Sequence, residues 1–267
     1  MRSVLKSLLV FSFIAFTFSE VRAEDEEGFV PLFDGKSLAG WTAARSSGEG
    51  DWGAFTVNEQ EQAIHAYAGA EEGSKQDSDC LNTVQQFSHY ILRLEYKWVG
   101  NRFKPRADWD RDAGLLYHVH GDLKRVWPHS LEMQIGETPG NSKNNLRRRF
   151  HTGDLFVLGR HLLTKTPREG RFYKAGVEPV GGRHVQTKLG VEKPMGEWNK
   201  MEIQIHGAEK AIFVFNGEVV HEVYDMQQKQ KDSDLVPLDK GHIGLQAEWA
   251  EIMYRKIRIK ELSVEGS

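Results

Sequence analysis

The feature that most constrains the fold of this chain is a repeated alternation of apolar and polar residues. In the segment YILRLEYKW, Tyr90, Leu92 and Leu94 fall on one face of an extended chain, whereas Arg93 and Glu95 fall on the other. The same alternation recurs in four further segments, AGLLYHVH (113–120), HSLEMQIGE (129–137), NKMEIQIH (199–206) and HIGLQAEW (242–249). A period of two is typical of half-buried β-strands. Since no helical period of comparable length accompanies it, the pattern predicts an all-β protein of antiparallel sheets, each with one packed face.

One connection between strands is predicted in detail. The segment AIFVFNGEVVHEV places Asn216 and Gly217 between two apolar runs. An Asn-Gly pair favours a two-residue hairpin turn, because both central residues of that turn need positive φ. We therefore expect strands on both sides of this pair.

The first 23 residues are predicted not to belong to the folded domain. Arg2 and Lys6 precede an apolar run that ends shortly before Ala23, which is the pattern of a secretory signal peptide. The run is too short for a membrane-spanning helix, and no later segment is apolar enough for one. We expect residues 1–23 to be a signal peptide and residues 24–267 to form one exported domain, periplasmic or secreted.

The charge and the cysteine content exclude two further features. A formal net charge of −3 offers no basic footprint for nucleic acid. Cys80 is the only cysteine, so no disulfide can form within the chain, and the stability of the domain must come from buried apolar surface.

The polar faces of the predicted strands carry a distinctive set of side chains. His118, His120, Glu132, Gln134 and Gln246 all fall opposite the apolar residues of their strands. A face rich in histidine, glutamate and glutamine suits a bent sheet that holds a polar ligand.

The stretch from Gly136 to Gly196 differs from the rest of the chain. It is rich in glycine, arginine and lysine, and its alternation is patchy, with one predicted strand in GDLFVLG (153–159). Long loops in a compact domain usually carry function, so we expect this stretch to form the rim and lid of the ligand site.

Several motifs, taken in order, carry a family resemblance. They are LFDGKSLAGW (32–41), DAGLLYHVH (112–120), SLEMQI (130–135), GEWNKMEIQIHG (196–207) and GHIGLQAEWAEIMYRKI (241–257). Together they resemble the bacterial 3-keto-disaccharide hydrolase domain family over about residues 28 to 263. Asp112 and Ala113 stand where this family usually has Asn and Ser, and YRKI stands in place of its usual Phe-Arg-Asn-Ile.

The resemblance implies a fold and a chemistry. The fold is a concanavalin A-like, jelly-roll β-sandwich of two curved antiparallel sheets, with a sugar site on the concave sheet. The chemistry is cleavage of 3-keto-glycosides, in which the C3 ketone makes the C2 proton acidic and the enolate then expels the group at C1. Water can add afterwards, which gives a net hydrolysis. This route needs a base near C2, an electrophile at the ketone oxygen and an acid for the departing oxygen.

Three residues are candidates for the centre of such a site. The alternation puts His118 and His120 on one strand and Glu132 on another, and either residue type could be the base. Together the three could also bind one divalent metal ion, which would polarise the ketone. In the structural alternative, one histidine packs at the sheet edge and Glu132 pairs with a basic residue. This alternative stays open because the spacing of the residues fixes no third metal ligand.

Further candidates come from the predicted lid and from a neighbouring strand. His151 and Asp154 could close over the sugar as an acid and the group that orients it. The alternative is a turn capped by Asp154 with a histidine at the surface. Lys97 could polarise the ketone, although exposed lysines are common on strands.

Two kinds of residue are candidates for substrate binding. Gln134 is expected to face the bound sugar, and Gln246 could bind a sugar hydroxyl group or hydrogen-bond across the strands. Trp109 and Trp127 lie in predicted loops and could stack on sugar faces.

Two other functions are compatible with the same fold. A non-catalytic carbohydrate-binding module would need only the aromatic and amide residues. A retaining glucanase would need a second carboxylate on the strand of Glu132, and Gln134 stands at that place. Each of these functions requires a sugar, so the predicted partner is a small-molecule or oligosaccharide substrate.

Overall fold

The computed structural model describes residues 27–46, 51–137, 150–159, 162–168, 171–175, 183–187, 192–230 and 234–263. These ranges contain strands and turns, and none of them includes a helix. No helix in the described part of the chain therefore has the length and apolarity needed to cross a membrane. The predicted signal peptide lies outside the described residues.

The larger sheet has 11 strands. Its main path consists of β11 (Arg171–Ala175), β10 (Leu162–Arg168), β15 (Glu218–Lys229), β14 (Lys210–Phe215), β13 (Asn199–His206), β6 (His89–Arg102), β18 (Ala250–Glu261), β4 (Ala63–Ala66) and β3 (Phe55–Asn58). Two short strands join from the side, β1 (Val30–Pro31) along β18 and β16 (Leu235–Pro237) along β15. All of these strand pairs are antiparallel, as the alternation predicts.

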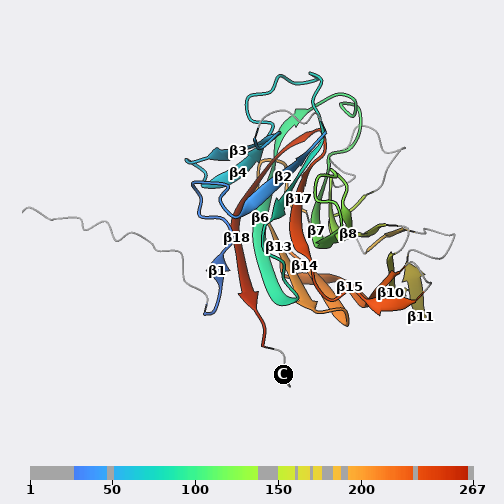
Figure 1. The fold of residues 1–267 in the computed structure, drawn as a ribbon. Coiled ribbons are helices and arrows are strands. Elements are labelled where there is room, and N and C mark those ends of the chain that lie inside the picture. The colour runs from blue at the N-terminus through green and yellow to red at the C-terminus, as the bar shows by residue number, and fades with distance from the viewer. Residues whose placement is uncertain are drawn as a thin grey trace, which may run out of the picture.

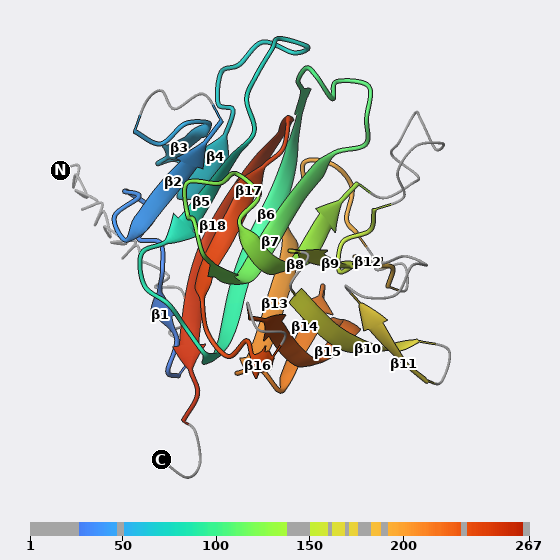
Figure 2. The ribbon, with the colours of Figure 1, turned by 45° about the vertical axis from the view of Figure 1, so that its right-hand side comes forward.

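The smaller sheet has seven strands. Their order is β12 (His184–Val185), β9 (Leu155–Leu158), β8 (His129–Gly136), β7 (Asp112–His120), β17 (His242–Ala247), β5 (Asp79–Thr83) and β2 (Trp41–Arg45). Figures 1 and 2 show that the two sheets overlie one another, with β9 and β12 beyond β8 at one edge and β2 at the other. The prediction of an all-β protein with two antiparallel sheets is confirmed.

The apolar faces of both sheets meet in one hydrophobic core. Strand β6 contributes Tyr90, Leu92 and Leu94, and strand β8 contributes Leu131 and Met133, all of them buried. The strand faces predicted from alternation in these segments are confirmed. The polar residues of β8 therefore point away from the core, onto the outer face of the smaller sheet.

The predicted hairpin turn is also confirmed. Asn216 and Gly217 connect β14 to β15, and their φ angles are +48° and +90°. Both values lie in the left-handed region that this turn needs.

Strand β7 departs from regular alternation at His118. The register between β7 and β8 shifts between Tyr117 and His120, and His118 has a φ of +51°. This β-bulge adds one residue to the strand and inverts the faces that follow it. Val119 consequently joins a small apolar cluster with Leu116.

The expectation that residues 136–196 consist mainly of loops is wrong for the part described here. The strand predicted in GDLFVLG is present as β9, but β10, β11 and β12 also lie within this range. Their short length and irregular sequence hide the period of two. Strands β9 and β12 extend the smaller sheet beside β8, so this stretch contributes part of the sheet surface itself.

Candidate functional site

The candidate site lies on the outer face of the smaller sheet. Glu132 on β8 is directly opposite Leu116 on β7 and Phe156 on β9. Gln246 on β17 is directly opposite Cys80 on β5. Because cross-strand partners point to the same side of a sheet, these residues form a surface that runs across several strands. Glu132 and Gln246 are nonetheless 4% and 1% exposed, so both side chains are buried within this surface.

Glu132 is the centre of this surface. Within the described part of the chain, its carboxylate forms no hydrogen bond and no ion pair. Burial raises the pKa of Glu132 well above the usual carboxyl value. The neighbouring carboxylates of Glu248, Asp112 and Asp154 raise this pKa further. A buried carboxyl with a raised pKa is suited to exchange protons near neutral pH.

Gln246 and Asn82 carry unsatisfied polar atoms on the same sheet face as this carboxyl. Both the Oε1 and the Nε2 of Gln246 are buried and have no hydrogen-bond partner among the described residues, and the same is true of Asn82 Nδ2. A buried polar atom without a partner is unfavourable unless a ligand supplies one. Gln246 thus offers a donor and an acceptor close to Glu132, whereas Asn82 lies on β5, two strands beyond β7.

Gly114 provides the space in which these side chains meet. A Cβ atom added at residue 114 would lie 2.1 Å from Gln246 Oε1 and 2.3 Å from Glu132 Oε1. Since Gly114 is the cross-strand partner of Gln134, the open position belongs to the same polar row of the sheet. Only glycine leaves this position free.

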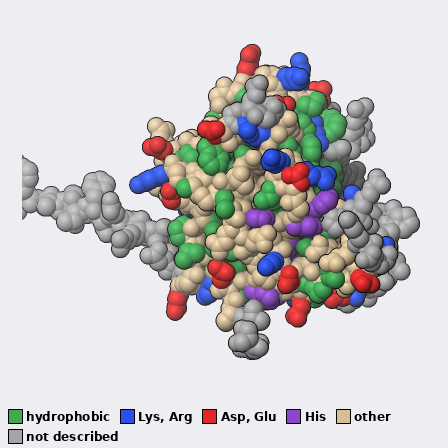
Figure 3. All heavy atoms as spheres, in the orientation of Figure 1, with side chains coloured by type: hydrophobic (Ala, Val, Ile, Leu, Met, Phe, Trp, Pro, Cys, Tyr) green, Lys and Arg blue, Asp and Glu red, His purple; other side chains and the backbone are tan. Residues whose placement is uncertain are grey.

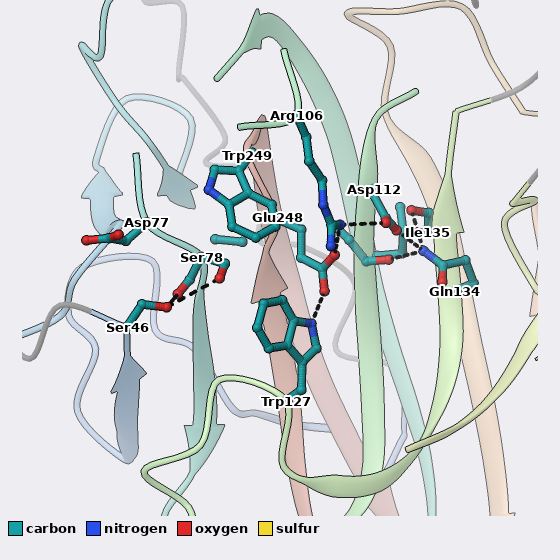
Figure 4. A network of polar contacts seen from close by, with 12 residues as sticks. Ser46, Asp77, Ser78, Arg106, Asp112, Trp127, Gln134, Ile135, Glu248 and Trp249 are labelled. Atoms are coloured by element: carbon teal, nitrogen blue, oxygen red, sulfur yellow. Dashed lines mark hydrogen bonds and ion pairs between the residues drawn. The ribbon is translucent and has the colours of Figure 1, made fainter. Parts of the chain in front are cut away.

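An ion-pair network borders the site on the side of β17. Arg106 donates from Nη1 to Asp112 Oδ2 at 3.1 Å and to Glu248 Oε2 at 2.6 Å. Glu248 also accepts a hydrogen bond from the indole N–H of Trp127. Figure 4 shows these groups converging from β7, β17 and two loops. The network fixes negative charge beside Glu132, which explains part of its raised pKa.

The Gln134 amide has a structural role that the sequence did not reveal. Its Nε2 donates to Asp112 Oδ1 at 2.5 Å and to the carbonyl oxygens of Ala113 and Ile135 at 2.7 and 3.2 Å (Figure 4). The cross-strand hydrogen bonding considered for Gln246 is thus made by Gln134 instead, whereas the Gln246 amide has no partner among the described residues.

Tryptophan side chains line the same border. Trp127 is 39% exposed, and its ring lies 6.0 Å from that of Trp249. The Arg106 guanidinium stacks over the rings of Trp249 and Trp109, at 4.4 and 4.9 Å from their centroids. Trp127 thus presents an accessible aromatic face beside the site, while Trp109 mainly supports Arg106.

Asp154 organises the other border, near β9 and β12. It is fully buried, and it accepts hydrogen bonds from His184 Nε2 at 2.7 Å and from the backbone N–H groups of Thr187 and His151 at 2.8 and 3.0 Å. His151 Nδ1 lies 3.8 Å from Asp154 Oδ1, beyond hydrogen-bond distance. The imidazole paired with Asp154 is therefore that of His184, which lies 30 residues further along the chain.

The structure corrects the placement of the histidines on β7. Because of the bulge, the His118 ring points into the sandwich, where Nε2 donates to the Gly207 carbonyl at 3.0 Å. Burial lowers the pKa of His118 to about 4. His120 lies at the end of the strand, where Nδ1 donates to the His118 carbonyl and the ring contacts that of His129. His118, His120 and Glu132 therefore do not form a common shell.

No group of three or more histidine, cysteine, aspartate or glutamate side chains in the described ranges has a geometry that could hold a metal ion. In the space-filling view, histidine side chains reach the surface at more than one place (Figure 3). His118, His120 and Glu132 thus do not form the three-ligand metal site expected from the sequence.

Lys97 lies on the other sheet. Its side chain extends from β6, donates to Glu61 Oε1 at 3.1 Å and stacks over the Trp198 ring. Since β6 belongs to the larger sheet, its polar face looks away from the smaller sheet. Lys97 and Glu132 therefore lie on the outer faces of different sheets and do not share one site.

Sequence reasoning missed three groups at the site. Glu248 was visible as a polar-face residue two positions from Gln246, so alternation could have indicated it. Arg106 and His184 come from segments without alternation, and no pattern in the sequence connects them to Glu132.

Comparison with known structures supports the fold. Two proteins of Parabacteroides distasonis, provisionally named glycosyl hydrolases, align with 17% and 19% identity and TM-scores of 0.55 and 0.53. The alignments cover 89% and 88% of this chain and 95% and 99% of those chains. The exoplasmic domain of VIP36 in its Ca²⁺- and Man3GlcNAc-bound form aligns with a TM-score of 0.51 and 9% identity, over 91% of each chain. The predicted concanavalin A-like β-sandwich is confirmed.

Comparison of sequences identifies the family. A search of curated proteins finds no significant match. The family described as the 3-keto-alpha-glucoside-1,2-lyase-like domain matches residues 28–260, which is most of the chain and nearly the range over which the motifs indicated a resemblance. The chain belongs to the 3-keto-alpha-glucoside-1,2-lyase-like domain family.

Proposed function

We propose that this protein is an enzyme that cleaves 3-keto-glycosides, with Glu132 as the base that removes the C2 proton. The observation that carries the proposal is the environment of Glu132. Its carboxyl is buried, has a raised pKa and has no partner among the described residues, and it lies next to the Gln246 amide, which is unsatisfied among the same residues. The family description supports the choice of a glycoside as substrate.

The first step breaks the C2–H bond. Glu132, once ionised, accepts the proton, and the electron pair delocalises into the C3 carbonyl as an enolate. A carboxylate whose pKa is raised binds the abstracted proton more strongly than an ordinary exposed carboxylate does. Burial, and then the neighbouring carboxylates of Glu248, Asp112 and Asp154, raise the pKa of Glu132 in this way.

Gln246 stabilises the charge that develops on the ketone oxygen. Its Nε2 is a buried hydrogen-bond donor without a partner among the described residues, and its Oε1 can accept from a sugar hydroxyl group. A fixed donor in a dry site stabilises an oxyanion more strongly than water does. Asn82 Nδ2 offers a second donor on the same face.

The second step breaks the bond between C1 and the leaving oxygen. The enolate electrons form a C1–C2 double bond, and the leaving oxygen departs with its electron pair and takes up a proton. If the reaction ends here, the enzyme is a lyase. If water then adds across the double bond, with OH at C1 and H at C2, the net reaction is hydrolysis. A divalent ion at the ketone would supply additional electrophilic stabilisation, but the described residues form no three-ligand site for one, so the proposed steps do not depend on it.

Export of the protein also remains part of the proposal. It rests on the basic, apolar and small-residue order of the first 23 residues. Periplasmic and secreted locations are equally compatible with that order.

The test is release of 4-nitrophenol from 4-nitrophenyl 3-keto-glucoside by the purified domain, with unoxidised 4-nitrophenyl glucoside alongside. We expect cleavage of the keto substrate alone, and a loss of about 100-fold or more in kcat/KM for Glu132→Gln. Glu61→Gln, the same change in the turn between β3 and β4, is the matched control and retains activity. Parallel assays after EDTA treatment test the metal ion. Binding of sugars without turnover of any keto-glycoside would instead support a carbohydrate-binding module.

A further inference from the structure

The pair formed by Asp154 and His184 is a second chemical group on the same sheet face. Asp154 is fully buried and receives three hydrogen bonds, of which the His184 Nε2–H bond is the shortest at 2.7 Å. The His184 ring also stacks on Phe156, with centroids 4.3 Å apart and an interplanar angle of 14°. A carboxylate on one side and an aromatic face on the other hold the imidazole in one orientation.

The strand register places this imidazole in line with Glu132. His184 is the direct partner of Phe156, and Phe156 is the direct partner of Glu132. The three residues therefore form one row on the outer face, and two strand spacings separate the ends of the row by about 10 Å between Cα atoms. Two side chains at that separation can reach neighbouring atoms of a single sugar ring.

His184 is also partly exposed, on the far side of Phe156 from Glu132. Its side chain is 24% exposed, whereas that of Asp154 is completely buried. Because Nε2 is bound to the carboxylate, Nδ1 is the nitrogen that can exchange a proton with a ligand. The hydrogen bond to the carboxylate fixes which nitrogen faces outward.

We propose that His184, oriented by Asp154, is the acid that protonates the departing C1 oxygen in the reaction proposed above, on which this inference rests. Glu132 takes the proton from C2, and the C1–O bond breaks with its electron pair on the oxygen. The proton on His184 Nδ1 moves to that oxygen, and the neutral imidazole remains hydrogen-bonded to Asp154. Each of the two groups thus handles one proton, and no other reactant is needed for the elimination.

This assignment revises the predicted lid pair of His151 and Asp154. The orienting role predicted for Asp154 fits its three hydrogen bonds. His151 contributes its backbone N–H to that carboxylate, while its ring nitrogen stays at 3.8 Å. His184 therefore replaces His151 as the candidate acid.

The test compares two leaving groups of different basicity. 4-Nitrophenolate leaves without help, whereas methoxide needs a proton, so an acid matters only for methyl 3-keto-glucoside. We expect His184→Gln to lose about 100-fold or more in kcat/KM on the methyl substrate and less than about 5-fold on the 4-nitrophenyl substrate. Glutamine retains a donor toward Asp154, which preserves the fold. His206→Gln on β13 of the larger sheet is the matched control.

Asp154→Asn provides a second variant with the same expected selectivity, and thermal unfolding identifies any variant that is not folded. If folded His184→Gln lost activity equally on both substrates, or on neither, the inference about His184 would be overturned. The proposal that Glu132 is the base would not be affected. Glu132→Gln affects both substrates, because proton removal precedes departure of either group. If wild-type protein turned over neither substrate, the proposed function would fail, and this inference with it.

Discussion

Glu132 packs directly over Gly114, with its Oε1 only 2.3 Å from the position that a Cβ atom at residue 114 would occupy. Gln246 Oε1 approaches the same position to 2.1 Å from the opposite side. The base and the proposed oxyanion donor therefore share one small space on β7. Their relative positions depend on the absence of a side chain there.

The first prediction concerns this space. Gly114→Ala should displace the ends of Glu132 and Gln246, because the atoms that a Cβ meets belong to side chains rather than to backbone. We expect kcat/KM to fall by about 10-fold or more, since small misplacements of catalytic groups slow reactions strongly. The change in unfolding free energy should remain small. Full activity in a folded Gly114→Ala protein would show that this close packing has no role in catalysis.

The second prediction concerns stability at different pH values. The pKa of Glu132 is raised in the folded protein, so above the ordinary carboxyl pKa the folded state binds more protons than the unfolded state, and stability falls as pH rises. Glu132→Gln removes the titratable group and therefore the fall in folding stability that it causes at high pH. We expect the variant to exceed wild type in thermal stability at pH 8, with a difference that shrinks toward pH 4. A difference that is the same at both pH values would contradict the raised pKa.

The third prediction concerns His118, whose pKa is lowered to about 4 in the folded protein. Its neutral form is favoured by folding, so this stability is present above pH 6.5 and is lost as pH falls toward 4, by up to about 3 kcal/mol. His118→Asn should reduce that acid-side loss in chemical unfolding. Asparagine suits the positive φ of the bulge.

The same variant tests whether His118 is a core residue, as the structure shows, or a catalytic or metal-binding residue, as the sequence suggested. A folded His118→Asn protein should keep kcat/KM within a few-fold of wild type at pH 7, because the ring points into the core. A metal ligand or a catalytic base at this position would instead give a loss of orders of magnitude.

The fourth prediction concerns Trp127, which is 39% exposed at the border of the site. Trp127→Ala removes an aromatic face on which a sugar or an aryl group can stack, so KM should rise by about 10-fold, in line with the usual energy of such contacts. Trp52→Ala is the matched control, because Trp52 is 37% exposed and lies in the loop before β3. An unchanged KM in Trp127→Ala would place the sugar elsewhere.

Alternation predicted the faces of the strands well, because a side chain on a regular strand has only two directions. It placed Glu132 and Gln246 on one polar surface. It failed at His118, since a single bulge inverts the order and leaves no signature in the residue types. It also failed at Lys97, because the pattern tells which side of a strand is polar but not which of the two sheets the strand joins.

The contact of His184 with Asp154 shows a second kind of feature that alternation in the sequence cannot predict. It depends on β12, which has only two residues, and on a separation of 30 positions in the chain. No local period can report such a contact. The side-chain environment that raises the pKa of Glu132 likewise depends on Glu248 and Asp112, which the fold brings in from two other strand ends.

The most direct test of the central claim is the fate of the hydrogen at C2. A 3-keto-glucoside carrying deuterium at C2 would be incubated with wild-type protein and with Glu132→Gln, beside a control without protein, and the deuterium released to water would be measured against aglycone. Removal of the C2 proton by Glu132 predicts slower cleavage of the deuterated substrate, loss of deuterium with each cleavage event, and neither process in the variant. Cleavage at an undiminished rate with the deuterium retained at C2 would contradict the account.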